Sequence, residues 1–213
     1  MSKCRLFIVR HTQTTGNVEK RFTGRHDYEV TPEGQEYIEL LTEELKDVRF
    51  DAVYSSTSGR AKKTIMPLAE INNKSIKEDE NLCEMYFGIY DGCTWEEVNK
   101  INPQIRQNQI ITNEIVGIPE QESMEEVAER MYACIEGIAN ENIGKTVLIG
   151  SHGVAIEAFL RKIVEIPFAE EREKFCQHNT AINEVTYEDG QFTILRLADM
   201  KHINQKKHND QGR

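Results

Sequence analysis

The sequence predicts an α/β fold, a three-layer sandwich in which helices flank a mostly parallel central sheet. Two observations predict this fold class. Continuous apolar runs at residues 6–9 and 146–149 are typical of strands that are buried on both faces. Such runs alternate along the chain with amphipathic segments of helical period, and this alternation is characteristic of a parallel sheet covered by helices.

The first half of the chain supplies three strands and two helices. The strand at 6–9 is followed by Thr31 and Pro32, a hydroxyl N-cap and a proline at the first helical position, which begin a helix. A second strand at 52–54 leads through a turn into a helix over about 60–71. Residues 75–77 are a third strand candidate.

The second half repeats the alternation and ends in a hairpin. Thr94 and Ser123 each open a capping box, and the second box begins a long amphipathic helix. The strand at 146–149 is followed by a helix that runs to about residue 163. Asp189-Gly190 is a hairpin turn signal between strands at about 184–187 and 192–197.

The expected organisation is one domain over residues 1–204, which suits a chain of 213 residues. Residues 102–121 are polar and read as irregular, so the stretch 100–122 is predicted to be an excursion at the rim of the site. The polar tail 205–213 is expected to be disordered.

Composition excludes several classes of function. A net charge of −10 disfavours nucleic acid and anionic lipid as partners, because both require a basic face. No apolar run is long enough to span a membrane, and the N-terminus lacks the pattern of a signal peptide, so we expect a cytoplasmic protein. Five scattered cysteines without a short paired spacing are expected to be free thiols in a reducing compartment.

Chemically useful side chains follow each central strand. Arg10 and His11 follow the first strand, Arg60 begins the helix after the second, and His152 follows the strand at 146–149. Strand ends in a parallel sheet lie side by side, and helix N-termini there add N–H donors. Each residue alone would more often be a loop or surface residue. Their joint occurrence predicts a phosphate pocket, in which arginines bind oxygens and imidazoles donate or attack.

Glu84 is the candidate for the proton donor that a phosphate-ester reaction needs. It lies in a loop between apolar and aromatic neighbours, in the segment 82–88. Such surroundings disfavour the charged form of a carboxyl group, as suits a general acid.

The chain resembles the histidine phosphatase superfamily, the phosphoglycerate-mutase-like enzymes. Four blocks carry the resemblance in the family's order: RHTQTTGN at 10–17, SSTSGRAKKT at 55–64, LCEMYFGIYDG at 82–92 and SHG at 151–153. The resemblance covers nearly the whole chain and implies a phosphoglycerate-mutase-like sandwich.

The resemblance also implies roles for individual residues. His11 would attack phosphorus and become a phosphohistidine, with its other ring nitrogen donating to a backbone carbonyl. Glu84 would protonate the leaving oxygen and then assist water. The phosphoryl oxygens would be bound by Arg10, Asn17, Arg60, His152 and Gly153. No metal and no cofactor are expected, because the arginines and His152 supply the positive charge.

Two positions depart from the family pattern. Thr12 stands where the family usually has glycine, so the loop beside the nucleophile is expected to be tighter. Thr23 stands where many members have glutamine, and it is a candidate substrate contact together with Tyr86.

A phosphomonoester phosphatase acting on a small phosphorylated metabolite is the first interpretation. The alternative is a phosphoglycerate mutase that depends on 2,3-bisphosphoglycerate, although the chain lacks an Arg-Arg, proline-rich segment between the acid block and the second histidine. A phosphate-binding module with little turnover would not need Glu84. A metal site of His11, Glu84 and His152 is disfavoured because two arginines would repel a cation.

The expected partner is a small-molecule phosphate ester. Neither nucleic acid nor a membrane is expected as a partner. The sequence is compatible with a homo-oligomer. Specificity is expected in loops at the rim, over residues 22–30, 86–90 and 102–122.

Overall fold

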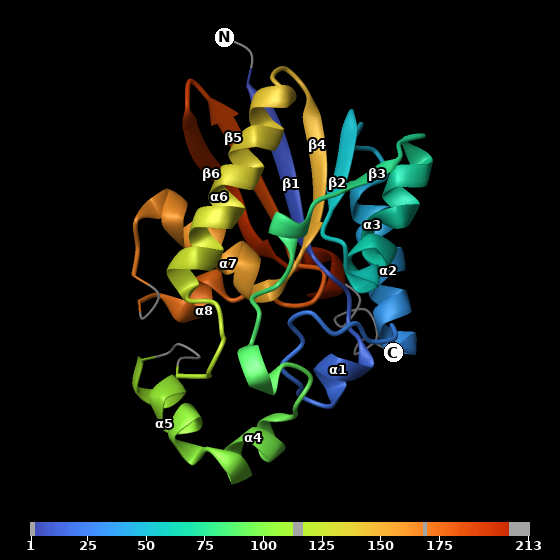
Figure 1. Ribbon diagram of the computed structural model, residues 1–213. Helices are drawn as coiled ribbons and strands as arrows, with labels where there is room; N and C mark the ends of the chain where they lie inside the picture. The colour runs from blue at the N-terminus through green and yellow to red at the C-terminus, as the bar shows by residue number, and fades with distance from the viewer. Residues whose placement is uncertain (1–2, 113–116, 168–169, 205–213) are drawn as a thin grey trace.

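The computed structural model describes residues 3–112, 117–167 and 170–204, which place six strands in one sheet in the order β3–β2–β4–β1–β5–β6 (Figure 1). β1 pairs in parallel with β4, and β2 pairs in parallel with both β3 and β4. β5 runs antiparallel to β1 and to β6. The predicted sandwich with a mostly parallel sheet is confirmed. The strands are β1 (Cys4–Arg10), β2 (Ala52–Ser55), β3 (Ile76–Glu78), β4 (Thr146–Ser151), β5 (Ile182–Glu188) and β6 (Gln191–Asp199).

Helices cover both faces of the sheet, and shorter ones lie beyond its carboxyl edge (Figure 1). The α-helices are α1 (Thr15–Val18), α2 (Pro32–Leu45), α3 (Gly59–Ile71), α4 (Trp95–Ile101), α5 (Pro103–Thr112), α6 (Met124–Glu141), α7 (Gly153–Val164) and α8 (Arg172–Phe175). Two 3₁₀ turns, η1 (Glu80–Leu82) and η2 (Gly88–Tyr90), flank the loop that carries Glu84.

The two faces of the sheet form two separate cores, because successive strand residues point to opposite sides. Phe7 and Val9 of β1 pack with Leu41 of α2 and Ile65 of α3 on one face. Leu6 and Ile8 belong to the other core, which α6 and α7 supply with residues such as Ile135 and Phe159. All of these side chains are fully or almost fully buried, so β1 is fixed from both sides. The chemical groups that follow β1 therefore start from a rigid base.

Helix and hairpin signals in the sequence correspond to observed elements. Thr31 accepts a hydrogen bond from the backbone of Gly34, and Pro32 is the first residue of α2. Thr94 and Ser123 form the predicted capping boxes of α4 and α6. Asp189 and Gly190 both have positive φ, as the two-residue turn between β5 and β6 requires.

The prediction of irregular structure for residues 102–121 was wrong over its first half, where α5 forms. Pro103 begins the helix, a position at which its missing N–H costs no hydrogen bond. Ile105 is buried, while Gln104 donates to Asn108 across one turn at 3.0 Å. The polar residues on both sides of Ile105 concealed the helical period. The predicted tail at 205–213 lies outside the described residues and stays a prediction.

Candidate active site

Two arginines and two histidines converge at the carboxyl edge of the sheet, as the strand order predicted. Arg10 ends β1 directly opposite Ser151 in β4, so His11 and His152 follow two paired strands. Their ring centroids are 5.2 Å apart. Arg60 reaches the same place from the first turn of α3, which follows β2. Both histidine rings and the Arg60 side chain are buried.

His11 is held as a neutral imidazole. Its Nδ1 lies 2.7 Å from the carbonyl oxygen of Thr12. A carbonyl only accepts hydrogen bonds, so Nδ1 carries the proton and Nε2 keeps its lone pair. Burial, followed by the charges of Arg60 and Arg10, holds the pKa of His11 well below its usual range. The expected hydrogen bond to a backbone carbonyl is present, and Nε2 is free to act as a nucleophile.

Thr12 ties the loop beside His11 to two helices. Its hydroxyl donates to the carbonyl oxygen of Gly34 in α2 at 2.6 Å. Its backbone N–H donates to the Thr64 hydroxyl of α3 at 2.8 Å. The side chain that stands in place of glycine therefore acts as an anchor, which fixes the carbonyl group that orients His11.

His152 is the other tautomer: its proton is on Nε2, whereas that of His11 is on Nδ1. Its Nδ1 lies 3.2 Å from Nη2 of Arg60, and its Nε2 lies 2.7 Å from the Ser56 hydroxyl. Because arginine only donates, Nδ1 accepts and Nε2 carries the proton. Burial, followed by the charges of Arg60 and His11, holds the pKa of His152 well below its usual range. The sequence motif at 55–64 includes Ser56 but assigns it no role. Its contact with Nε2 shows that it orients the His152 ring.

Arg60 is fixed by a loop that the sequence did not connect with it. Nη2 donates to the carbonyl oxygens of Thr23 and Gly24 at 2.8 and 2.9 Å, and Nη1 donates to the carbonyl oxygen of His26 at 2.6 Å. The Asp27 carboxylate lies 3.2 Å from Nη1 and also accepts from the backbone of Gly59. These contacts fix the orientation of the Arg60 guanidinium, which is buried in the site.

Both arginines of the site have a buried donor that lacks a partner among the described residues: Nε of Arg10 and Nε of Arg60. Buried polar atoms are nearly always paired, so orphaned donors on two cations point to an anion that would complete them. Arg10 also donates from Nη1 to the carbonyl oxygen of Gln177. A Cβ at Gly153 would stand only 3.3 Å from Nε of Arg10, so glycine at this position leaves the guanidinium its room.

Glu84 lies in the same region, almost fully buried and held by backbone donors. Oε1 accepts from the N–H groups of Met85 and Ala155 at 2.9 and 3.0 Å, and Oε2 accepts from Val154 at 3.2 Å. Val154 and Ala155 belong to the first turn of α7. The apolar neighbours that the sequence indicated are present, since Met85 and Phe87 are buried beside it. The carboxyl group is thus aimed by hydrogen bonds that sequence alone did not reveal.

A cavity of about 230 Å³ lies against these groups. Of the predicted site residues, Arg10, Asn17, Thr23, Glu84 and Gly153 line it. His11, Arg60 and His152 are not among its lining residues and are buried. Arg60 donates to the carbonyl oxygen of the lining residue Thr23 and contacts His152, whose ring lies against that of His11. Tyr86 is also absent from the lining, where Phe87 stands instead.

Asn17 is oriented by its own turn. Its Oδ1 accepts from the backbone and hydroxyl of Thr14 at 3.0 and 3.1 Å, and Asn179 approaches it at 3.3 Å. With the oxygen engaged in this way, the amide nitrogen is the group that can donate into the cavity.

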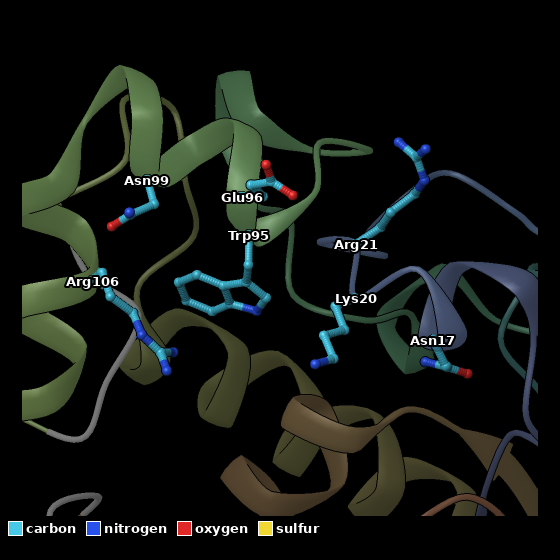
Figure 2. Close-up of a pocket in the computed structure, with 7 residues that line it drawn as sticks. All are labelled: Asn17, Lys20, Arg21, Trp95, Glu96, Asn99 and Arg106. Atoms are coloured by element: carbon cyan, nitrogen blue, oxygen red, sulfur yellow. The ribbon is translucent and has the colours of Figure 1, made fainter.

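Figure 2 shows the residues that line a second cavity, which has a volume of about 720 Å³. The two share Asn17, Arg21 and Trp95 as lining residues. The larger cavity is completed by Lys20, Glu96, Asn99 and Arg106. Apart from Asn17, none of these residues was predicted as a site residue from the sequence. Only the predicted rim excursion at 100–122 pointed towards this region.

Arg130 of α6 is a further site residue that the sequence did not predict. It donates to the carbonyl oxygens of Cys83 and Glu84 at 2.8 and 3.1 Å, and it forms an ion pair with Glu122. It therefore holds the loop that carries the candidate acid. The amphipathic pattern of α6 gave no signal for this role, because an arginine on a helix is usually solvated.

Comparison with known proteins shows to which family the chain belongs. The family model of the histidine phosphatase superfamily (branch 1) matches residues 6–200 of the chain. The chain belongs to the histidine phosphatase superfamily.

Several relatives extend over almost the whole chain. A Hydrogenobacter thermophilus protein named "Putative phosphoserine phosphatase 2" is 29% identical, with 94% of this chain and 98% of that protein covered. A Shigella dysenteriae protein named "Probable phosphoglycerate mutase GpmB" is also 29% identical, over 93% and 94% of the two chains. Among solved structures, Bacillus stearothermophilus YhfR matches with a TM-score of 0.88 at 26% identity, covering 94% of this chain and 99% of its own.

A phosphoserine phosphatase from Entamoeba histolytica, solved with 3-phosphoglyceric acid, matches with a TM-score of 0.81 at 23% identity. It covers 94% of this chain and 99% of its own, and at that identity it supports the fold. None of the helices in the described part of the chain has the length and apolar character needed to cross a bilayer.

Proposed function

We propose that the chain is a metal-independent phosphomonoester phosphatase that acts through a phosphohistidine at His11 on a small phosphorylated metabolite. The observation that carries the proposal is the state of His11. Its ring is buried and neutral, with Nδ1–H bound to the Thr12 carbonyl oxygen and Nε2 unprotonated. Two arginines beside it favour the arrival of a negative phosphoryl group, and they disfavour protonation of the nucleophile.

In the first step, Nε2 of His11 attacks phosphorus and forms the P–N bond while the bond to the leaving oxygen breaks. Glu84 gives its proton to that oxygen, and the free alcohol departs. Arg10, Arg60 and Asn17 stabilise the charge on the equatorial oxygens, and the Nε2–H of His152 joins them by turning from the Ser56 hydroxyl to the phosphoryl group. Among its described hydrogen bonds, Oε2 of Glu84 accepts only from Val154, so it is the oxygen with room for the proton.

In the second step, the Glu84 carboxylate takes a proton from water as the water oxygen attacks phosphorus. The P–N bond breaks, inorganic phosphate forms, and His11 returns to its neutral state. Glu84 must therefore be stable in both protonation states. Its carboxyl group is buried and accepts hydrogen bonds from three backbone N–H groups, which hold it in place for both proton transfers.

The test is turnover of an aryl phosphate by the purified protein with excess EDTA present. We expect full activity, because no step needs a metal. His11→Ala should lower kcat by about 10⁴-fold or more and remove the acid-labile phosphoenzyme, while circular dichroism stays unchanged. Loss of activity on chelation, or activity that survives His11→Ala, would overturn the proposal.

A second candidate is a phosphoglycerate mutase, which the similarity to the protein named GpmB favours. The two enzymes differ in the acceptor of the phosphohistidine, which is water in a phosphatase and a second substrate hydroxyl in a mutase. We expect 3-phosphoglycerate with 2,3-bisphosphoglycerate to release inorganic phosphate faster than it yields 2-phosphoglycerate. Faster isomerisation would instead identify a mutase.

A further inference from the structure

The loop that orients Arg60 belongs to no helix or strand. Residues 23–26 lie between α1 and α2, and the carbonyl oxygens of Thr23, Gly24 and His26 accept from the Arg60 guanidinium at 2.8, 2.9 and 2.6 Å. Backbone N–H groups that lie outside regular structure need partners elsewhere. The partners of the N–H groups in this loop therefore decide how firmly Arg60 is aimed.

The carboxylate of Asp91 supplies these partners. Its Oδ1 accepts from the N–H of Gly24 at 2.7 Å, and its Oδ2 accepts from the N–H of Arg25 at 2.9 Å. Oδ2 also lies 3.0 Å from Nδ1 of His26, and this nitrogen carries the proton because a carboxylate only accepts. The Asp91 side chain is only 3% exposed, so little water competes for its oxygens. Asp91 thus binds three consecutive residues of the loop.

Two successive peptide groups connect Asp91 directly with Arg60. In the peptide group that joins Thr23 to Gly24, the N–H donates to Asp91 and the carbonyl oxygen accepts from Arg60. The peptide group that joins Gly24 to Arg25 has the same two partners. A peptide group is planar and rigid, so the acceptor that fixes its N–H also fixes the direction of its carbonyl oxygen. The position of the Asp91 carboxylate is therefore passed on to the Arg60 guanidinium.

The same loop is pressed against the segment that carries the candidate acid. A Cβ at Gly24 would stand 2.5 Å from Oδ1 of Asp91 and 2.6 Å from the carbonyl oxygen of Met85, so only glycine fits between them. The N–H of Gly92 donates to the carbonyl oxygen of Phe22 at 2.8 Å, which continues the contact. The loop and this segment are thus joined around the Asp91 side chain.

We propose that Asp91 is a positioning residue for phosphoryl transfer, which aims Arg60 at the phosphoryl oxygens through the backbone of residues 23–25. The inference rests on the proposed function, which places Arg60 at those oxygens. Asp91 is not among the residues that line either cavity, so it acts through Arg60 and not on the substrate itself. Its effect concerns the phosphoryl group and does not depend on the leaving oxygen, unlike that of Glu84.

The experiment begins with Asp91→Asn, which keeps the size of the side chain but replaces one acceptor oxygen with an amide donor. We expect kcat/KM to fall by about ten-fold or more, and to the same extent for an alkyl phosphate and a nitrophenyl phosphate. Asp91→Ser introduces no opposed amide donor and covers the case in which Asp91→Asn does not fold; the same loss is expected.

Asp51→Asn is the matched control. Asp51 also accepts from a backbone N–H, that of Thr146 at 2.9 Å, but it does so at the amino end of β4, away from the site. This variant should retain kcat and KM. An unchanged kcat/KM in folded Asp91→Asn would overturn the inference. A loss confined to the alkyl phosphate would also overturn it, because it would assign the effect to Glu84.

A double-mutant cycle with Arg60→Lys tests the route of the effect. Lysine keeps the positive charge but lacks the planar fork that binds the carbonyl oxygens of the loop. If Asp91 acts through Arg60, Asp91→Asn should change kcat/KM by less than about two-fold in the Arg60→Lys background. A loss as large as that in the wild-type background would show that Asp91 acts independently of Arg60, contrary to the inference.

Binding of inorganic phosphate separates this inference from the proposed function, because it needs no nucleophile. Calorimetry should show phosphate binding that is weaker in Asp91→Asn than in Asp51→Asn by about ten-fold. That result supports the positioning role even if turnover does not proceed through His11. Equal phosphate affinity in the two variants defeats the positioning role even if His11 becomes phosphorylated.

Discussion

The carboxyl edge of the sheet and the excursion formed by α4 and α5 serve one site but are built differently. His11, Arg60 and His152 are buried and fixed by several hydrogen bonds each. Lys20 and Arg106 are exposed, and Trp95 is only partly covered. Reaction chemistry needs fixed geometry, whereas selection among substrates needs accessible groups. The difference indicates that mutations at the edge should change kcat, while those in the excursion should change KM.

The largest effect in this comparison is expected for Glu84→Gln. Without a proton donor, kcat for an alkyl phosphate should fall by about 10²–10⁴-fold, and by much less for a nitrophenyl ester whose leaving oxygen needs no proton. Glu157→Gln is the matched control, because Glu157 is another carboxyl group that lines the same cavity. Any change in kcat should be the same for the alkyl and the nitrophenyl ester. An equal loss for both esters in Glu84→Gln would mean that Glu84 is not the general acid.

Arg130→Met tests how firmly the edge is held. The variant leaves the carbonyl oxygens of Cys83 and Glu84 without their donor, and the free energy of unfolding should fall by about 2–3 kcal/mol. Arg196→Met removes a more exposed arginine that pairs with Glu44, and it should cost less than about 1 kcal/mol. Urea denaturation measures both variants. Similar losses would show that Arg130 does not hold the loop.

The buried histidines predict a dependence of stability on pH. The pKa of His11 and that of His152 are both lowered in the folded protein, chiefly by burial. The unfolded chain therefore binds protons below about pH 6.5 that the folded chain does not bind. Stability is fully retained above that pH and falls below it, by about 1.4 kcal/mol per pH unit for each histidine until its folded pKa is reached.

Urea denaturation between neutral and mildly acidic pH measures this slope. His11→Asn should remove about one histidine's share of it. A slope that is unchanged in this variant would mean that His11 is already protonated in the folded enzyme, contrary to its role as a neutral nucleophile.

The smallest effect on the enzyme is expected for Thr94→Ala, at the start of α4. Thr94→Ala removes the hydroxyl that caps α4 and should cost about 1 kcal/mol. Because Trp95 is the first residue of α4 and lines both cavities, KM for a phosphate ester should rise while kcat is retained. Ser123→Ala removes the same type of cap from α6 and should lower stability without changing KM. A fall in kcat with Thr94→Ala would place α4 in the chemical step instead.

The sequence predicted the edge well because its signals are local and repeated. Each apolar strand is followed within a few residues by a chemical group, and the geometry of a parallel sheet brings such groups together. His11, Arg60 and His152 were placed at one site in this way. Thr12 shows the limit of the approach. The expected tighter loop depended on its size, whereas its role depends on Gly34 and Thr64 from two distant helices.

The excursion was predicted poorly because its order comes from tertiary contacts. α5 presents mainly polar side chains around the buried Ile105, so its helical period is faint. Lys20 and Trp95 are brought together by a backbone hydrogen bond between residues that are far apart in the sequence. Arg130 likewise acts on carbonyl groups of a loop almost fifty residues away. No residue pattern encodes contacts of this kind.

The central claim is that Nε2 of His11, held neutral in a buried cationic pocket, attacks phosphorus. The most direct measurement is rapid quenching during turnover of an aryl phosphate, with mass spectrometry to locate the phosphoryl group and ³¹P NMR to identify the bonded nitrogen. We expect a single phosphohistidine at His11, attached at Nε2. Attachment at Nδ1 or at another residue, or turnover without any phosphoenzyme in a quench fast enough to trap it, would contradict the account.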